Sequence, residues 1–190
     1  PATWRVRGKP TDRAMLMAGI ESGLHPSKLE TEMPRIDSLP FDAERRYAAS
    51  LHKTQSGNRL YFSGAPETLL AHSTKLLTEH GESMLNDGAR DAFLQKNQQA
   101  AERGMRVIAV AKRDAPNETE IQRKADGLHD LTFLGLIAFH DPVRPDVPDV
   151  IAQSKRAGIR TVILPGDHRA TARSVAIECG ILKETDDDAE

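Results

Sequence analysis

Residues 158–175 read GIRTVILPGDHRATARSV, and this stretch says most about the fold. The run Thr161–Leu164 consists of β-branched and apolar residues, which predicts a strand buried on both faces. The run stops at a Pro-Gly-Asp turn, and a helical pattern begins at His168. In open α/β sheets, ligands and catalytic groups gather where strands end. Asp167, in that turn, is therefore the first carboxylate that we expect to bind a metal ion or a phosphate.

Short motifs that follow one another in a fixed order carry a resemblance over nearly the whole chain. They read GKPTD at 8–12, FDAERR at 41–46, SGAPE at 63–67, RGMRV at 103–107, DPVRP at 141–145 and PGDH at 165–168. The set resembles the nucleotide-binding and phosphorylation domains of P-type cation-transporting ATPases, where the matching motifs are GDPTE, FDSERK, KGAPE, GLRV, DPPRP and TGDH. A single such motif arises by chance, whereas their shared order is specific.

The pattern of predicted elements divides the chain in two. Up to about residue 140, strands that pair locally stand beside helices, which is typical of an antiparallel α+β layer. After Asp141 the pattern changes to helix, strand, helix, as in a parallel α/β sheet. The resemblance implies a nucleotide-binding domain over 1–140 and part of a haloacid-dehalogenase-like phosphorylation domain over 141–190. The fold class is thus α/β (α+β), an antiparallel sheet with flanking helices followed by a partial parallel segment.

Individual elements follow from periodicity and from their start and stop residues. We predict helices over 10–23, 66–72, 86–103, 146–157 and 168–180. We predict strands over 34–39, 47–53, 59–62, 105–112, 131–139 and 160–164. Turn residues at 54–58 (TQSGN) predict a hairpin with a loop of about five residues.

Composition limits the class of protein. A chain of 190 residues with 38% hydrophobic and 28% charged residues is typical of a globular protein. A net charge of −2 argues against nucleic acid as a partner. The single cysteine, Cys179, excludes an internal disulfide, and its apolar surroundings favour a buried, inert thiol. No apolar run reaches the roughly 20 residues of a membrane span, and the first residues do not resemble a secretory signal.

A nucleotide site needs a platform for the purine ring, polar partners for its amine and cations for the phosphates. By itself Phe41 would be read as core packing, and Asp12 as an acid at the start of a helix. The resemblance instead implies that Phe41 stacks on adenine and that Asp12 accepts a hydrogen bond from its amine. It implies that Arg46 and Arg106 approach the phosphates, although two solvated surface arginines remain the alternative. Gly64 lets the backbone approach a flat ligand or turn sharply.

Ser63 departs from the family pattern. The family has Lys at this position, at the base of the adenine pocket, and Ser supplies neither its charge nor its reach. We therefore expect nucleotide binding that is weaker than usual, in the millimolar range.

In the phosphorylation segment, the resemblance assigns Asp141 and Asp167 to the carboxylates near the aspartyl phosphate and its Mg2+. Arg144 matches an arginine of the hinge between the two domains, where it either stabilises the hinge or contacts the nucleotide. Pro165 replaces the family's Thr, so a hydroxyl and a backbone N–H that would face the phosphoryl oxygens are lost.

The resemblance implies a cytoplasmic domain of an integral membrane pump, with ATP and Mg2+ as ligands. The transported cation would bind elsewhere in the parent protein, whose remaining domains are this chain's partners. The sequence contains neither DKTGT nor GDGxNDxP, so we expect the fragment to bind ATP without hydrolysing it. The alternative, which Ser63 and Pro165 motivate, is a catalytically impaired homologue with a regulatory or scaffolding role. A stand-alone phosphatase is disfavoured, because no DxD nucleophile motif precedes the α/β segment.

Overall fold

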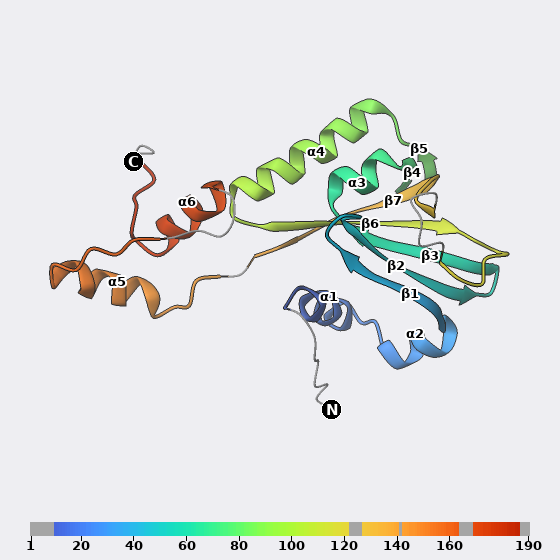
Figure 1. Cartoon of the computed structure of the whole chain (residues 1–190), viewed down its shortest axis with the longest axis horizontal. Helices are drawn as coiled ribbons and strands as arrows, with labels where there is room; N and C mark the ends of the chain where they lie inside the picture. The colour runs from blue at the N-terminus through green and yellow to red at the C-terminus, as the bar shows by residue number, and fades with distance from the viewer. Residues whose placement is uncertain (1–9, 122–126, 141, 164–168, 187–190) are drawn as a thin grey trace.

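The computed structural model describes residues 10–121, 127–140, 142–163 and 169–186, and within them a single mixed sheet dominates (Figure 1). The sheet has seven strands in the order β1-β2-β3-β6-β7-β4-β5. Its strands are β1 (Arg35–Asp42), β2 (Tyr47–Thr54), β3 (Gly57–Gly64), β4 (Ser73–Thr78), β5 (Gly81–Met84), β6 (Arg106–Asp114) and β7 (Leu131–Phe139). All neighbouring strands are antiparallel except β4 and β7, which are parallel. The predicted antiparallel layer with flanking helices is confirmed.

The described helices are α1 (Pro10–Glu21), α2 (Pro26–Glu32), α3 (Pro66–Ala71), α4 (Asp87–Glu102), α5 (Val147–Arg156) and α6 (Arg169–Glu178). The first four lie beside the sheet, and α5 and α6 lie beyond one end of it (Figure 1). Figure 1 shows α3 and α4 on one side of the sheet and α1 and α2 on the other. The described helices include none that is both long and apolar enough to cross a membrane.

The core lies between the sheet and α3 and α4. Every second residue is buried from Tyr47 to Leu51 in β2 and from Leu60 to Gly64 in β3. This alternation places one face of the pleat against the helices, which contribute Leu69 and Leu70. Phe133 of β7 is fully buried, and its ring lies 4.8 Å from that of Phe93 in α4. The opposite face, which carries Ser63, is only half-buried.

The predicted helices and strands of residues 10–139 form where the patterns place them, with one wrong loop. Thr54 pairs directly with Gly57, so the β2–β3 loop has two residues rather than about five. Gly57 has φ +113, a conformation that other residues rarely adopt, and it closes the tight turn. The Thr54 hydroxyl donates to the Gly57 carbonyl at 2.6 Å.

The β4–β5 hairpin and α2 were not predicted. The outer strand β5 and most of β4 are exposed, so the hairpin shows no clear alternation of buried and exposed residues. Its place in the sheet comes from β7, because Ser73 and Leu76 of β4 pair with Leu131 and Phe133. A pairing between strands so distant in sequence leaves no local signal.

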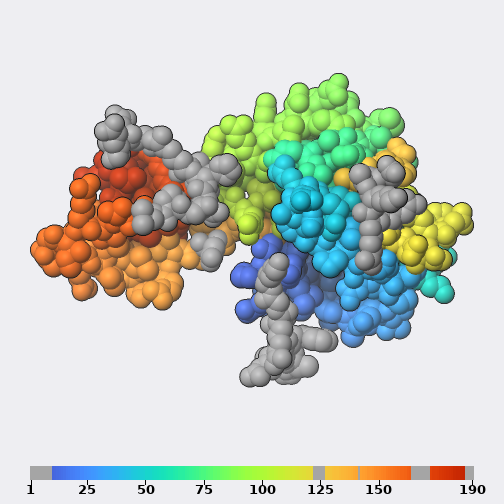
Figure 2. Space-filling view, viewed as in Figure 1, coloured from blue at the N-terminus to red at the C-terminus, as the bar shows by residue number. Residues whose placement is uncertain are grey.

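Beyond β7, the expected helices form but the strand between them does not. Residues 160–163 are not in a strand, and the side chain of Val162 is 66% exposed. A strand requires a neighbour for its N–H and C=O groups, and no described strand pairs with this segment. The prediction of a strand over 160–164 is therefore wrong for residues 160–163. In Figure 2, α5 and α6 form a lobe that meets the rest of the chain near α4, which α6 contacts.

Candidate functional site

The strand register brings most of the predicted nucleotide residues to one end of the sheet. Asp42 at the end of β1 pairs with Tyr47, which in turn pairs with Gly64 at the end of β3. Gly64 also pairs with Ala109 near the start of β6. As a result, one end of the sheet carries Phe41, Arg46, Ser63, Gly64 and Arg106. Figure 1 shows this end on the side of α5 and α6.

A β-bulge presents Phe41 to solvent. Regular alternation would place Phe41 on the same face as Leu39, which is 5% exposed and part of the core. The register between β1 and β2 shifts between Leu39 and Asp42, and Phe41 is 58% exposed. Such a bulge re-aims a side chain. Core packing, the alternative that the sequence left open for Phe41, is excluded by this exposure.

The turn after Phe41 is held by Asp42. Its carboxylate accepts hydrogen bonds from the backbone N–H groups of Glu44 and Arg45, at 3.0 and 3.1 Å. The bond from the Arg45 N–H holds the pKa of the Asp42 carboxyl below its usual value. Arg46 ends the turn at φ +62, a left-handed conformation. Sequence reasoning missed Asp42 as the organiser of this turn, although an Asp at the start of a turn is a recognisable signal.

Gly64 has no room for a side chain. A Cβ atom built on Gly64 would lie 2.5 Å from the Arg46 carbonyl oxygen and 2.8 Å from Tyr47 Cα. The neighbouring Ala65 N–H donates to that same carbonyl at 2.9 Å. The close approach that the sequence suggested for Gly64 is thus already made by the protein's own backbone, and contact with a ligand stays a prediction.

Ser63 and Arg106 point to the face that α3 and α4 leave uncovered. Ser63 pairs with Ala48 and Val110, and directly paired residues share a face of the sheet. Arg106 lies four residues before Val110 on β6, so alternation puts it on the same face. Arg106 is exposed and Ser63 is half-buried. This end of the sheet thus carries an exposed apolar ring on β1, a small hydroxyl on β3 and an exposed cation on β6.

Arg46 is engaged with α3 rather than free. Its Nη2 lies 3.4 Å from Glu67 Oε2. The other oxygen of Glu67 accepts from Asn97 Nδ2 of α4 at 3.2 Å. Sequence reasoning did not single out Glu67 or Asn97, because their contacts join segments that are distant along the chain.

The remaining predicted residues are not brought to this group. Asp12 is exposed in the first turn of α1, and no other described residue forms a hydrogen bond or ion pair with it. Arg144 is exposed and lies 3.7 Å from Asp146. Asp141 and Asp167 lie outside the described residues, as does Pro165.

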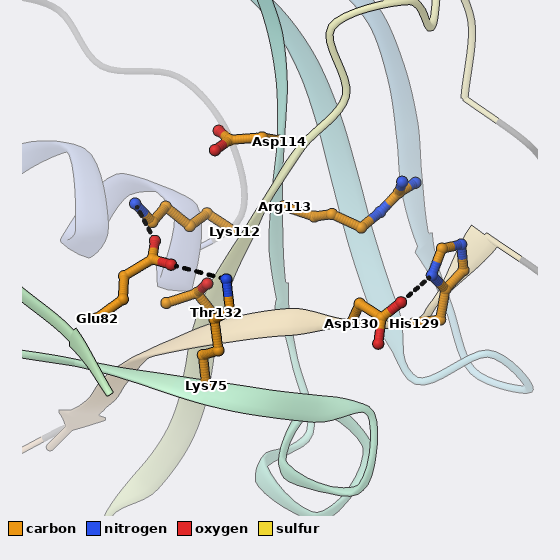
Figure 3. Close-up of a pocket in the computed structure, with 8 residues that line it drawn as sticks. All are labelled: Lys75, Glu82, Lys112, Arg113, Asp114, His129, Asp130 and Thr132. Atoms are coloured by element: carbon orange, nitrogen blue, oxygen red, sulfur yellow. Dashed lines mark hydrogen bonds and ion pairs between the residues drawn. The ribbon is translucent and has the colours of Figure 1, made fainter. Parts of the chain in front are cut away.

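A cleft of about 270 Å³ lies at the opposite end of the sheet (Figure 3). Charged side chains line it, among them Glu82, Lys75, Lys112 and Arg113. Glu82 lies 3.0 Å from Lys112 Nζ and 3.4 Å from Lys75 Nζ, while Arg113 pairs with Glu118 at 2.8 Å. Figure 3 shows Glu82 between the two lysines. Because these cations already have carboxylate partners, the cleft is an ion-pair network that joins β4, β5 and β6.

Because Glu82 must be ionised to pair with the two lysines, the free energy of unfolding depends on pH. Its hydrogen bond with Lys112 holds the pKa of the Glu82 carboxyl below its usual value. The stabilisation is therefore present above the unfolded-state pKa and is lost as pH falls through the folded-state value. At neutral pH, we expect Glu82→Gln to lower the free energy of unfolding by about 0.5–1 kcal/mol, the size of an exposed ion pair.

Urea denaturation of both proteins at about pH 7 and about pH 3 measures this, and the difference should shrink at the lower pH. Glu79→Gln is the matched control, because Glu79 lies in the same hairpin, is exposed and has no side-chain partner among the described residues. An equal pH dependence in the two variants would contradict the assignment.

Comparison with known proteins agrees with the motifs. Residues 1–146 match the family described as P-type ATPase, cytoplasmic domain N. The chain is 32% identical to Cation-transporting ATPase pma1 of Synechocystis sp. and 29% identical to Calcium-transporting ATPase 1 of Lactococcus lactis, each over 96% of its length. It is 31% identical to Probable cation-transporting ATPase F of Mycobacterium tuberculosis over the same share.

The chain spans about a fifth of these relatives, since the alignments cover 20%, 21% and 20% of their lengths. The family match covers most of the chain, including all seven strands of the sheet. The chain therefore belongs to the P-type cation-transporting ATPases, and its residues 1–146 correspond to their cytoplasmic domain N.

Proposed function

We propose that the chain binds ATP at the end of the sheet that carries Phe41. The observation that supports this most is the bulge, which exposes an aromatic ring at the end of β1, in the same turn region as Arg46 and two strands away from Ser63 of β3. A ring that is 58% exposed has little value for the core but offers a stacking platform. The residues of the sheet end supply this platform and two cations for the phosphates, which are two of the three kinds of group that a nucleotide requires.

Each residue has a role in this proposal. Phe41 stacks on adenine, and Ser63 and Gly64 form the floor beneath it. Arg46 and Arg106 approach the phosphates, where a guanidinium makes bidentate contacts. Asp12 accepts from the adenine amine after a movement of α1, since no described hydrogen bond or ion pair joins the exposed Asp12 side chain to the sheet.

Mg2+ would come with the nucleotide phosphates. Among the described residues, no group of three or more His, Cys, Asp or Glu side chains could hold a metal ion. We propose that Asp141 and Asp167 face the phosphoryl group and that Arg144 belongs to the hinge. Mg2+ would neutralise charge on the phosphates there.

The activity of the whole pump is the wider proposal. The parent protein would couple ATP hydrolysis, through an aspartyl phosphate, to cation transport across a membrane. Residues 1–140 would be its nucleotide-binding domain and residues 141–190 part of its phosphorylation domain. This chain, which contains no DKTGT, would bind ATP without hydrolysing it. Its partners would be the other domains of the same polypeptide.

The affinity should be low. Ser63 cannot supply the charge-assisted contact that the family's Lys makes, so we expect a dissociation constant in the millimolar range, roughly −4 kcal/mol. Isothermal titration with ATP and Mg2+ measures it. A submicromolar constant would contradict the importance assigned to Ser63.

The location of the site is tested by amide chemical shifts during an ATP titration. Shifts should concentrate at Phe41, Gly64 and Arg106. Thr132 and Lys75, in the cleft at the other end of the sheet, serve as internal controls and should not move. Shifts scattered over both ends, or confined to the cleft, would refute the proposed site.

A catalytically impaired homologue with a regulatory or scaffolding role is the second candidate. Ser63 favours it, because the register places this small side chain on the open face beside Ala48 and Val110. ATPase activity of the parent protein separates the two: turnover that depends on the transported cation supports the pump, and ATP binding without turnover supports the alternative.

A further inference from the structure

Arg46, the last residue of the β1–β2 turn, has a carboxylate partner that is held in place from two sides. Glu67 Oε2 lies 3.4 Å from Arg46 Nη2, and Glu67 Oε1 accepts from Asn97 Nδ2 at 3.2 Å. The pair joins the β1–β2 turn to α3, and Asn97 extends the link to α4. Both charged side chains are about half exposed.

The backbone fixes the two residues relative to each other. The Arg46 carbonyl oxygen accepts a hydrogen bond of 2.9 Å from the backbone N–H of Ala65, and Ala65 lies two residues before Glu67. Pro66 begins α3 and restricts its first turn, where Glu67 stands. Arg46 itself is set at φ +62 by the turn that Asp42 holds. The side chains thus meet because their main chains are already joined, which distinguishes them from an incidental surface pair.

This arrangement has a consequence for a phosphate ligand. An exposed ion pair is weak, whereas a guanidinium binds phosphate through short, charge-assisted bonds. A phosphate group that approaches Arg46 must compete with the Glu67 carboxylate and is also repelled by its charge. A nucleoside, which has no phosphates, neither competes with Glu67 for Arg46 nor is repelled by the carboxylate charge.

We propose that Glu67 is a specificity-determining residue, which holds Arg46 against α3 and limits how much the site gains from a triphosphate over a bare nucleoside. This rests on the proposed function, because it takes the sheet end as the nucleotide site. Glu67 acts through Arg46, and Asn97 keeps the carboxylate in place.

The test compares ATP and adenosine binding to the unmodified chain and to Glu67→Gln. Gln keeps an oxygen that can accept from Asn97, so the link to α4 survives while the charge is removed. ATP affinity should rise about two- to fivefold at low salt, the fold-change that corresponds to releasing an exposed ion pair. Adenosine affinity should not change. The gain should fade at about 1 M salt, where exposed charges are screened.

Controls separate this from other effects. Glu44→Gln removes an equal charge from the same exposed turn, where Glu44 has no side-chain partner among the described residues, and should leave the ratio of ATP to adenosine affinity unchanged. In an Arg46→Gln background, Glu67→Gln should have no effect on ATP binding. If Glu67→Gln still raises ATP affinity in the Arg46→Gln background, the proposal is wrong and the Glu67 charge acts on ATP directly. If Glu67→Gln lowers the affinity for ATP and for adenosine alike, the proposal is wrong and Glu67 has a structural role.

Two failures are distinguishable. If the unmodified chain binds ATP at the sheet end but Glu67→Gln binds it equally, the role of Glu67 is wrong and the proposed function stands. If neither ATP nor adenosine shifts the amide signals of Phe41 and Gly64, both are wrong.

Discussion

Gly64→Ala is expected to lower the free energy of unfolding by about 3 kcal/mol, from overpacking together with a weakened hydrogen bond. The added Cβ would lie 2.5 Å from the Arg46 carbonyl oxygen and 2.7 Å from Tyr47 Cβ. The carbonyl oxygen and Tyr47 Cα are backbone atoms at the start of the neighbouring strand. They cannot move aside for the new Cβ as the end of a flexible side chain would. The strands must separate, and the bond from the Ala65 N–H to the Arg46 carbonyl weakens. A domain has only about 5–15 kcal/mol of stability, so the loss is large.

Urea denaturation measures the change, and Gly88→Ala is the matched control. A Cβ at Gly88, in the first turn of α4, would meet Asn86 Oδ1 at 3.6 Å, an ordinary contact. That variant should be neutral or gain up to about 1 kcal/mol, because Ala is a better helix former than Gly. Equal stability of Gly64→Ala and the unmodified chain would show that β2 and β3 move apart at little cost.

Phe41→Ala is expected to weaken ATP binding about tenfold, because stacking of a base on an aromatic ring contributes about 1–3 kcal/mol. Since the ring is 58% exposed, the free energy of unfolding should change by no more than about 0.5 kcal/mol. We therefore expect Phe41→Ala to change the ATP affinity while leaving the free energy of unfolding almost unchanged. Core packing would reverse it, with a large loss of stability.

The affinity is measured from amide shifts, which follow weak binding well. Ile36→Ala is the control, because Ile36 lies on the same strand, is 42% exposed and is near the other end of β1. It should leave ATP binding unchanged. Phe41→Trp should preserve binding, since the indole offers a larger stacking face. An unchanged affinity in Phe41→Ala would exclude the bulge as the adenine platform.

Local patterns predicted the elements whose own residues carry the signal. The start of α4 is an example, because Asn86 caps the helix by accepting from the Ala89 N–H at 2.8 Å. The strands β2 and β3 show the alternation of a half-buried sheet in their own residues. The β4–β5 hairpin lacks such a pattern and forms because β7 offers it an edge. The segment 160–163 has the pattern of a buried strand, but it lacks a described neighbour to pair with.

The candidate site shows the same division. The motifs selected Phe41, Arg46, Ser63, Gly64 and Arg106, but their spacing could not show that they share one end of the sheet. That follows from the antiparallel register of β1, β2, β3 and β6. The ion-paired cleft at the other end came from contacts between β4, β5 and β6, which no motif marks.

The family and the class of fold could be read from the sequence alone, because local motifs and hydrophobic periodicity carry them. The same motifs predict the residue types of a nucleotide site. The three-dimensional structure was needed to find that Phe41 is exposed, that backbone atoms leave no room for a Cβ at Gly64 and that Glu67 pairs with Arg46. Each of these depends on a β-bulge, a strand pairing or a helix contact between residues that are separated along the chain. Such contacts are set by the packing of the whole sheet, and therefore no short stretch of sequence contains them.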